Sequence, residues 1–95
     1  MPEVRFRVRW PDRTESLCYS PSRVVTQHLA QGASYPLEQF VHLSTAALEA
    51  GSRRVAEIYG MGCGHAAWQS EEIRRQAERF RDWPEATVTV EEFVT

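Results

Sequence analysis

The stretch VRFRVRW, residues 4–10, decides the fold, because its side chains alternate strictly between apolar and basic. The apolar side chains are those of Val4, Phe6, Val8 and Trp10, and the basic ones are those of Arg5, Arg7 and Arg9. A period of two is typical of a β-strand with one face buried and the other in solvent. The sequence therefore predicts a strand here, with a row of arginines on its outer side.

A tight turn and a second strand follow. Pro11 and Asp12 suit the second and third positions of a turn, and residues 15–19 then resemble a short strand. A three-residue loop with a bulge at Arg13 predicts a register in which Cys18 enters the core. This loop requires a positive φ at Arg13, which strains a residue other than glycine.

A four-residue loop is the alternative, and it would reverse both faces of the second strand. It pairs Val8 with Leu17 and Phe6 with Tyr19. We favour the three-residue loop because it places unlike charges opposite each other and uses the usual type I turn with a bulge. In that register Leu17 and Tyr19 point outward, beside the arginine row.

Two helix starts are visible after the hairpin. Ser20 and Pro21 suit the N-cap and the first helical position, and they predict a helix that reaches about Ala30. A similar start at Pro36 opens a long helix, whose apolar residues recur every three or four positions. Gly60 is expected to end this helix.

The long helix carries small residues at Ser44 and Gly51 within an apolar stripe that continues to Ile58. They predict that another element crosses the helix closely there. A junction with three glycines (YGMGCGH, residues 59–65) follows, and a third helix is expected over about residues 64–83.

A last strand is predicted over residues 86–94, where Val88 and Val90 alternate with polar residues. The element order is β-β-α-α-α-β. The simplest α+β arrangement is a two-layer sandwich, a three-stranded antiparallel sheet with three helices on one face. Glu91 would then complement the arginine row. We expect residues 1–95 to form a single α+β domain.

Composition excludes several classes of function. The net charge is −2, which gives no overall attraction to nucleic acid or to an anionic membrane. The start of the sequence, MPEVRFRVRW, has no apolar run, so we expect neither a signal peptide nor a membrane anchor. Two cysteines, Cys18 and Cys63, do not make a disulfide framework and fit a reducing compartment. We therefore expect a cytoplasmic protein without nucleic-acid or membrane partners.

Chemistry-bearing side chains are few. Zinc sites usually contain a close pair of cysteines, whereas Cys18 lies far from the Cys63–His65 pair in sequence, so we expect no metal and no cofactor. The three glycines follow a helix, which favours a helix end and a turn over a phosphate-binding loop. Cys63 near a helix start is a candidate thiol nucleophile, but cysteine is more often a packed residue.

Two surfaces remain as candidate sites. The open sheet face would bind a partner protein, because apolar and aromatic residues among arginines are typical of interfaces, although scattered apolar residues are also normal on surfaces. Its candidate residues are Arg5, Arg7, Leu17 and Tyr19. The junction between the second and third helices would bind a small ligand. Its candidate residues are Tyr59, Cys63 and His65.

Four segments together resemble a family of small bacterial proteins known as nitrogen starvation response proteins. They are MPEVRFRVRWPD (1–12), CYSPS (18–22), YPL (35–37) and AEIYGMGCGHA (56–66), and the resemblance extends over nearly the whole chain. It implies a gene cluster with a nitrilase, a radical SAM enzyme, an acetyltransferase, an AIR synthase-related protein and a flavin-dependent oxidoreductase. That cluster is associated with nitrogen scavenging from cyanide or nitriles. Relatives often have glycine at position 13 and a more polar residue at position 17, and the family has no established catalytic residues.

These observations lead to a functional hypothesis. We expect a non-enzymatic accessory or adaptor protein of a nitrogen-scavenging pathway, acting by protein contact through the open sheet face. The nitrilase, the radical SAM enzyme and the flavin oxidoreductase are the partners that the resemblance suggests. The alternative is a small-molecule binder or sensor at Cys63 and His65, and a third hypothesis is a thiol carrier or minor enzyme based on Cys63. The protein would be a monomer or a homodimer.

Overall fold

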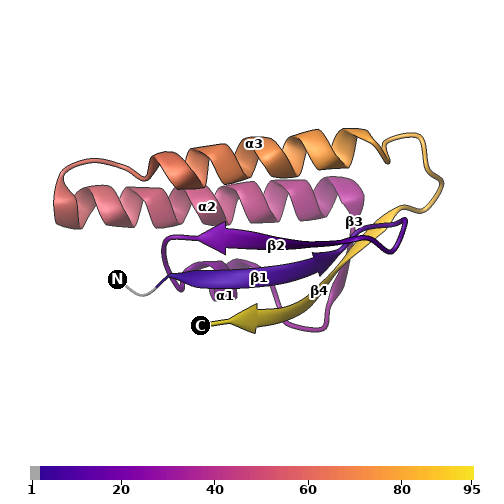
Figure 1. The fold of residues 1–95 in the computed structure, drawn as a ribbon, viewed down its shortest axis with the longest axis horizontal. Coiled ribbons are helices and arrows are strands. Elements are labelled where there is room, and N and C mark those ends of the chain that lie inside the picture. The colour runs from indigo at the N-terminus through magenta and orange to yellow at the C-terminus, as the bar shows by residue number, and fades with distance from the viewer. Residues whose placement is uncertain (1–2) are drawn as a thin grey trace.

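The computed structural model describes residues 3–95, and this part of the chain forms a four-stranded antiparallel sheet with two long helices and one short helix (Figure 1). The elements are β1 (Val4–Arg9), β2 (Glu15–Ser20), α1 (Val25–His28), β3 (Ser34–Pro36), α2 (Leu37–Tyr59), α3 (Gly64–Glu78) and β4 (Thr87–Val94). The strand order is β2-β1-β4-β3, so β2 and β3 are the sheet edges. The α+β class is confirmed, whereas the prediction of three strands is wrong.

Strand β1 pairs with β2 in the register that the three-residue loop predicts. Arg9 lies opposite Glu15. Phe6 lies opposite Cys18, which is therefore buried in the core. Arg13 has a φ of 70°, as the bulged turn requires. The alternative four-residue loop is excluded, because it would reverse the two faces of β2.

The first predicted helix is shorter than expected. Residues 21–24 form turns, and α1 comprises only Val25–His28 instead of reaching about Ala30. Ser20 does not cap this helix, because it is the last residue of β2. Its hydroxyl donates a hydrogen bond to the carbonyl of Ser22 at 2.8 Å. Such local bonds compete with helix formation and account for the late start of α1.

A fourth strand, β3, precedes the long helix and was missed in the sequence. It pairs antiparallel with β4, with Ser34 opposite Thr89. Pro36 is the N-cap of α2 rather than its first residue. The N–H of Leu37 donates a hydrogen bond of 3.0 Å to the carbonyl of Ala86, which directly precedes β4. Because the backbone groups of successive residues point to opposite sides of a strand, those of Pro36 face the outer edge of the sheet. A proline there loses no bond of the sheet.

Helix α2 ends where predicted, but its last two turns lie outside the hydrophobic core. Gly60 has a φ of 85°, the left-handed conformation that glycine favours after a helix. The predicted close crossing is present at Gly51, where an added Cβ would lie 3.2 Å from Cγ of Pro21. Val55 is only half-buried and Ile58 is 55% exposed, so the apolar stripe continues onto the surface.

Helix α3 lies alongside α2 (Figure 1) and ends at Glu78, before the predicted end near Trp83. Turns then lead into β4, whose last part is displaced by a bulge. Arg7 lies opposite Glu92, whereas the next residue of β1, Val8, lies opposite Val90. The unmatched residue between Val90 and Glu92 is Glu91, which forms the bulge. The bulge shifts the alternation of the strand by one residue, so Phe93 faces the core although Val88 and Val90 occupy even-numbered positions.

One hydrophobic core joins the sheet to the helices. It contains the inward residues of β1, β2 and β4 together with buried residues of all three helices. Trp10 is its aromatic centre, with ring centroids 5.7 Å from Phe40 and 6.0 Å from Phe80. These contacts hold α2 and the turn that follows α3 against the same end of the sheet.

Replacing Arg13 with glycine is expected to raise the free energy of unfolding by about 0.5–1 kcal/mol, because glycine adopts positive φ without strain. The control is Arg13→Ala, which removes the same side chain but keeps the Cβ that causes the strain. Urea unfolding at neutral pH measures both. Equal effects of glycine and alanine would show that the turn stores no strain at this position.

Candidate functional site

The arginine row is neutralised by carboxylates on the same face of the sheet. Each of its three members has at least one ion pair. The pairs are Arg5 with Glu3 (3.2 Å), Arg7 with Glu92 and with Glu15 (3.7 Å), and Arg9 with Glu15 (3.1 Å) and Glu91 (2.7 Å). The pairing predicted for Glu91 is confirmed. This face therefore presents paired charges, with no excess of positive charge, around Leu17, which is 54% exposed.

Tyr19 does not stand exposed on the sheet, as the sequence suggested, but is half-buried against the start of α3. Its ring stacks on His65, with centroids 4.1 Å apart and planes 7° apart. Its backbone N–H donates to Oε1 of Gln69 at 3.0 Å. The end of β2 lies beside the first turns of α3, so the two predicted candidate sites meet at Tyr19.

Cys63 belongs to the same junction. It is the N-cap residue of α3, and its N–H donates to Oγ of Ser52 at 2.9 Å. Burial, followed by the neighbouring Cys63 thiol, raises the pKa of the Tyr19 phenol. The phenol is therefore a neutral hydrogen-bonding group near physiological pH. Of the three predicted ligand-binding residues, His65 stacks on Tyr19 and Cys63 is near enough to raise the pKa of its phenol, while Tyr59 is 64% exposed at the end of α2.

Trp68 extends this cluster and was missed as a site residue. Its ring lies 5.8 Å from that of His65, centroid to centroid, and the side chain is 57% exposed. We call Tyr19, His65 and Trp68 the aromatic row. The sequence did carry a signal, because Trp68 falls outside the inner stripe of its helix and so places a large aromatic ring in solvent.

Further apolar side chains are exposed where α2 turns into α3. They are Ile58 (55%), Tyr59 (64%) and Met61 (73%), which we call the apolar turn. Single exposed apolar residues are ordinary, but three within four positions are unusual, and Trp68 on the next helix is exposed as well. Tryptophan and tyrosine are enriched at the centres of protein interfaces.

The two cysteines differ in environment and are both free thiols. Cys18 is buried in the core, whereas Cys63 is half-buried at the junction. Within residues 3–95, no group of three or more His, Cys, Asp or Glu side chains is placed to hold a metal ion. No helix in this described range is long and apolar enough to span a membrane.

Comparison with known proteins shows the family to which the chain belongs. A family model described as nitrogen starvation-induced protein NitG matches residues 5–93. Searches of the curated proteins and of the solved structures gave no significant match. The matched range includes every strand and helix of the structure except the first and last residues of the sheet.

The buried thiol predicts a dependence of stability on pH. Burial raises the pKa of Cys18 from 9.0 to about 12, so the folded protein keeps a proton that the unfolded chain loses above about pH 9. The stabilisation is present below pH 9 and is lost towards pH 12, at about 1.4 kcal/mol per pH unit. Tyr19 acts in the same direction, because its pKa is also raised.

Urea unfolding of the wild type and of Cys18→Ala between pH 7.5 and 10.5 isolates this contribution, because Tyr19 is present in both proteins. The alanine variant is less stable at pH 7.5 because it leaves a small cavity in the core. We expect the stability difference between the two proteins to shrink as the pH rises above 9. A constant difference over the whole range would contradict the buried position of Cys18.

Proposed function

Because the chain belongs to the nitrogen starvation-induced protein NitG family, we propose that it is an accessory protein of the nitrogen-starvation response that acts by binding another protein. The observation that carries this proposal is the exposure of large apolar side chains on both sides of the α2–α3 junction, in the apolar turn and at Trp68. An uncovered group of large apolar side chains beside a charged rim is typical of a protein-binding surface. Family membership supports the biological setting, and the exposed apolar side chains support the proposed mode of action.

The proposed interface joins two parts of the molecule. The aromatic row and the apolar turn form its centre, and the outer face of the sheet around Leu17 continues it beyond Tyr19. Arg5 is the cross-strand partner of Tyr19, and Arg7 is that of Leu17, so the four residues expected to bind a partner are neighbours. Their ion pairs suit them to the rim of an interface, where charges influence partner choice and association rate more than affinity.

A non-catalytic role is part of the proposal. Tyr19 and His65 are engaged with each other through a ring stack, and the N–H of Cys63 is fixed by Ser52. Such packing supports a structural use of these groups in shaping a surface. The resemblance to proteins of nitrile- or cyanide-scavenging gene clusters suggests the partner: a nitrilase, a radical SAM enzyme or a flavin oxidoreductase, met in the cytoplasm.

A second candidate function is binding of a small molecule at the junction. The meeting of a phenol, a thiol and an imidazole from Tyr19, Cys63 and His65 is the observation that favours it. The two functions differ in their dependence on sulfur. An accessory protein tolerates Cys63→Ser, whereas a thiol-dependent binder loses its ligand, which native mass spectrometry of the purified protein would detect as the loss of an extra bound mass.

The accessory function predicts different effects for two exposed tryptophans. Trp68→Ala should weaken partner binding at least 10-fold, as is usual for a central aromatic contact. Trp83→Ala is the matched control, because Trp83 is 47% exposed but lies beyond the other end of α3. It should change affinity less than twofold.

The measurement is co-expression with each candidate enzyme, followed by native mass spectrometry and calorimetric titration of any complex that forms. Circular dichroism would verify that both variants fold. Equal affinities of the two variants for a captured enzyme would contradict an interface centred on Trp68. If none of the three enzymes binds the wild type, the proposed partners are wrong.

A further inference from the structure

The two edges of the sheet are protected differently. The β3 edge is three residues long and ends in Pro36, and both features discourage pairing with another strand. The β2 edge is six residues long, its register with β1 is unbroken, and its sequence, ESLCYS, contains neither proline nor lysine. Edge strands in folded proteins are usually blunted, because their free N–H and C=O groups accept any extended chain. Strand β2 is therefore the edge at which pairing with another chain is possible.

The backbone groups facing this edge follow from the antiparallel pattern. Alternate residues of such a strand bond to the neighbouring strand, and the residues between them face away. The N–H of Tyr19 donates to Gln69 of α3, so Tyr19 belongs to the set that faces away from β1. Glu15 and Leu17 have the same parity. Their N–H and C=O groups consequently point to the open edge.

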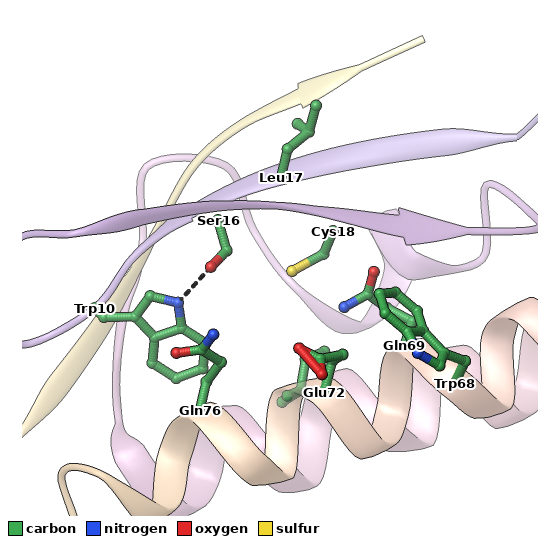
Figure 2. A pocket seen from close by; sticks show the side chains of 9 residues that line it. Trp10, Ser16, Leu17, Cys18, Trp68, Gln69, Glu72 and Gln76 are labelled. Carbon is green, nitrogen blue, oxygen red and sulfur yellow. Dashed lines mark hydrogen bonds between the residues drawn. The ribbon is translucent and has the colours of Figure 1, made fainter.

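A cleft of about 250 Å³ lies between this edge and α3 (Figure 2). Trp10, Cys18 and Ile73 give it an apolar part. Its lining also includes the polar side chains of Ser16, Gln69, Glu72 and Gln76 and the exposed Trp68. Figure 2 shows the Cys18 side chain pointing toward α3, whereas Leu17 points away from it, so Leu17 borders the cleft through its backbone. An open edge above a partly apolar cleft suits an extended chain that pairs through its backbone and inserts alternate side chains.

We propose that β2 and α3 bind an extended segment of a partner protein, which adds to the sheet as a fifth strand. This inference rests on the proposed function, and it names the form in which the partner binds. Backbone bonds to Glu15 and Leu17 would hold the segment, and one apolar side chain would enter the cleft. The cleft has room for a leucine but is too small for a folded domain.

Charge defines the segment further. Among the described residues that line the cleft, Glu72 alone carries a charge. Its carboxylate accepts hydrogen bonds from Nε (2.9 Å) and Nη2 (2.7 Å) of Arg75, whose side chain is 71% exposed, so a basic residue of the segment would share or displace this arginine. A lysine or arginine two positions from the apolar residue would lie on the same side of the added strand and reach Glu72. The expected motif is apolar, any residue, basic.

A second copy of the chain fits this edge less well than a lone segment. Helix α3 lies directly against β2, as the Tyr19–His65 stack and the Tyr19–Gln69 bond show. Two β2 strands paired edge to edge would be about 4.8 Å apart, and each would bring its own α3. Packed helices need about 8–10 Å between their axes, so the two α3 helices would collide. A partner strand without a helix beneath it avoids this collision.

The test is a titration followed through the backbone amide signals of the isotope-labelled protein. The probe is the capped peptide acetyl-Ser-Thr-Leu-Thr-Lys-Thr-amide, raised to millimolar concentration. The control peptide has prolines in place of the leucine and the following threonine. Whichever set of alternate residues faces β2, one of its N–H groups is then missing. We expect signal changes confined to residues 15–19 and 68–76 with the probe and none with the control. Equal changes with both peptides, or no change with the probe, would overturn the proposal.

Two variants at one position separate backbone from side-chain effects. Leu17→Pro removes the N–H that faces the edge without breaking a bond to β1, and we expect it to abolish peptide binding. Leu17→Ala keeps the N–H and should retain binding within about threefold, because the side chain points away from the cleft. Circular dichroism would verify both folds. Loss of peptide binding in the alanine variant alone would contradict pairing through the backbone.

The remaining outcomes distinguish this inference from the proposed function. Signal changes at residues 15–19 that depend on protein concentration, without peptide, would show that a second copy occupies the edge and would overturn the proposal. A captured enzyme that binds Leu17→Pro normally but not Trp68→Ala would overturn strand addition and leave the accessory function intact. Peptide binding in the absence of any captured enzyme would support the edge site while the proposed partners fail.

Discussion

The antiparallel pairing of β1 with β2 is the constraint on which the rest of the structure depends. The bulged turn at Arg13 fixes its register, and the register decides which side of each strand is buried. A shift of one residue would place Cys18 in solvent and Leu17 in the core. With the observed register, β1 becomes a central strand that pairs with β4 on its other side, and its arginines meet the carboxylates of β2 and β4 on the outer face. The inward residues then form the surface on which the helices pack.

The same register places β2 at the edge of the sheet and its last residues beside the start of α3. Tyr19 consequently covers His65 and bonds to Gln69, which closes one end of the edge while Glu15 and Leu17 remain open. The aromatic row, the apolar turn and the cleft all border α3, two of them near its first turn. This concentration would let one chain of 95 residues offer the proposed partner both a hydrophobic anchor and a strand edge. The proposed function and the proposed strand addition thus use adjoining parts of one surface.

Strictly alternating segments and helix-ending glycines could be predicted from the sequence, because their signals are local. The hairpin register, the positive φ at Arg13 and the helix end at Gly60 were all predicted correctly. Strand β3 was missed because three residues are too few to alternate. The bulge at Glu91 had a readable signal, since Val90 and Phe93 are an odd number of positions apart, yet both face the core. The contact between Tyr19 and His65 joins residues distant in sequence, and local patterns cannot place a strand end against a helix start.

Hydrogen exchange of the backbone amides of β2 in the free protein tests the central claim most directly. The account predicts slow exchange at residues 16, 18 and 20, which bond to β1, and fast exchange at residues 15 and 17, which face the open edge. Residue 19 should be intermediate, because only a glutamine side chain accepts its N–H. Slow exchange at residues 15 and 17 with fast exchange at 16 and 18 would mean that the register is shifted by one residue. Uniformly slow exchange would mean that the edge is already covered. Either result would contradict the structure of the β2 edge described above.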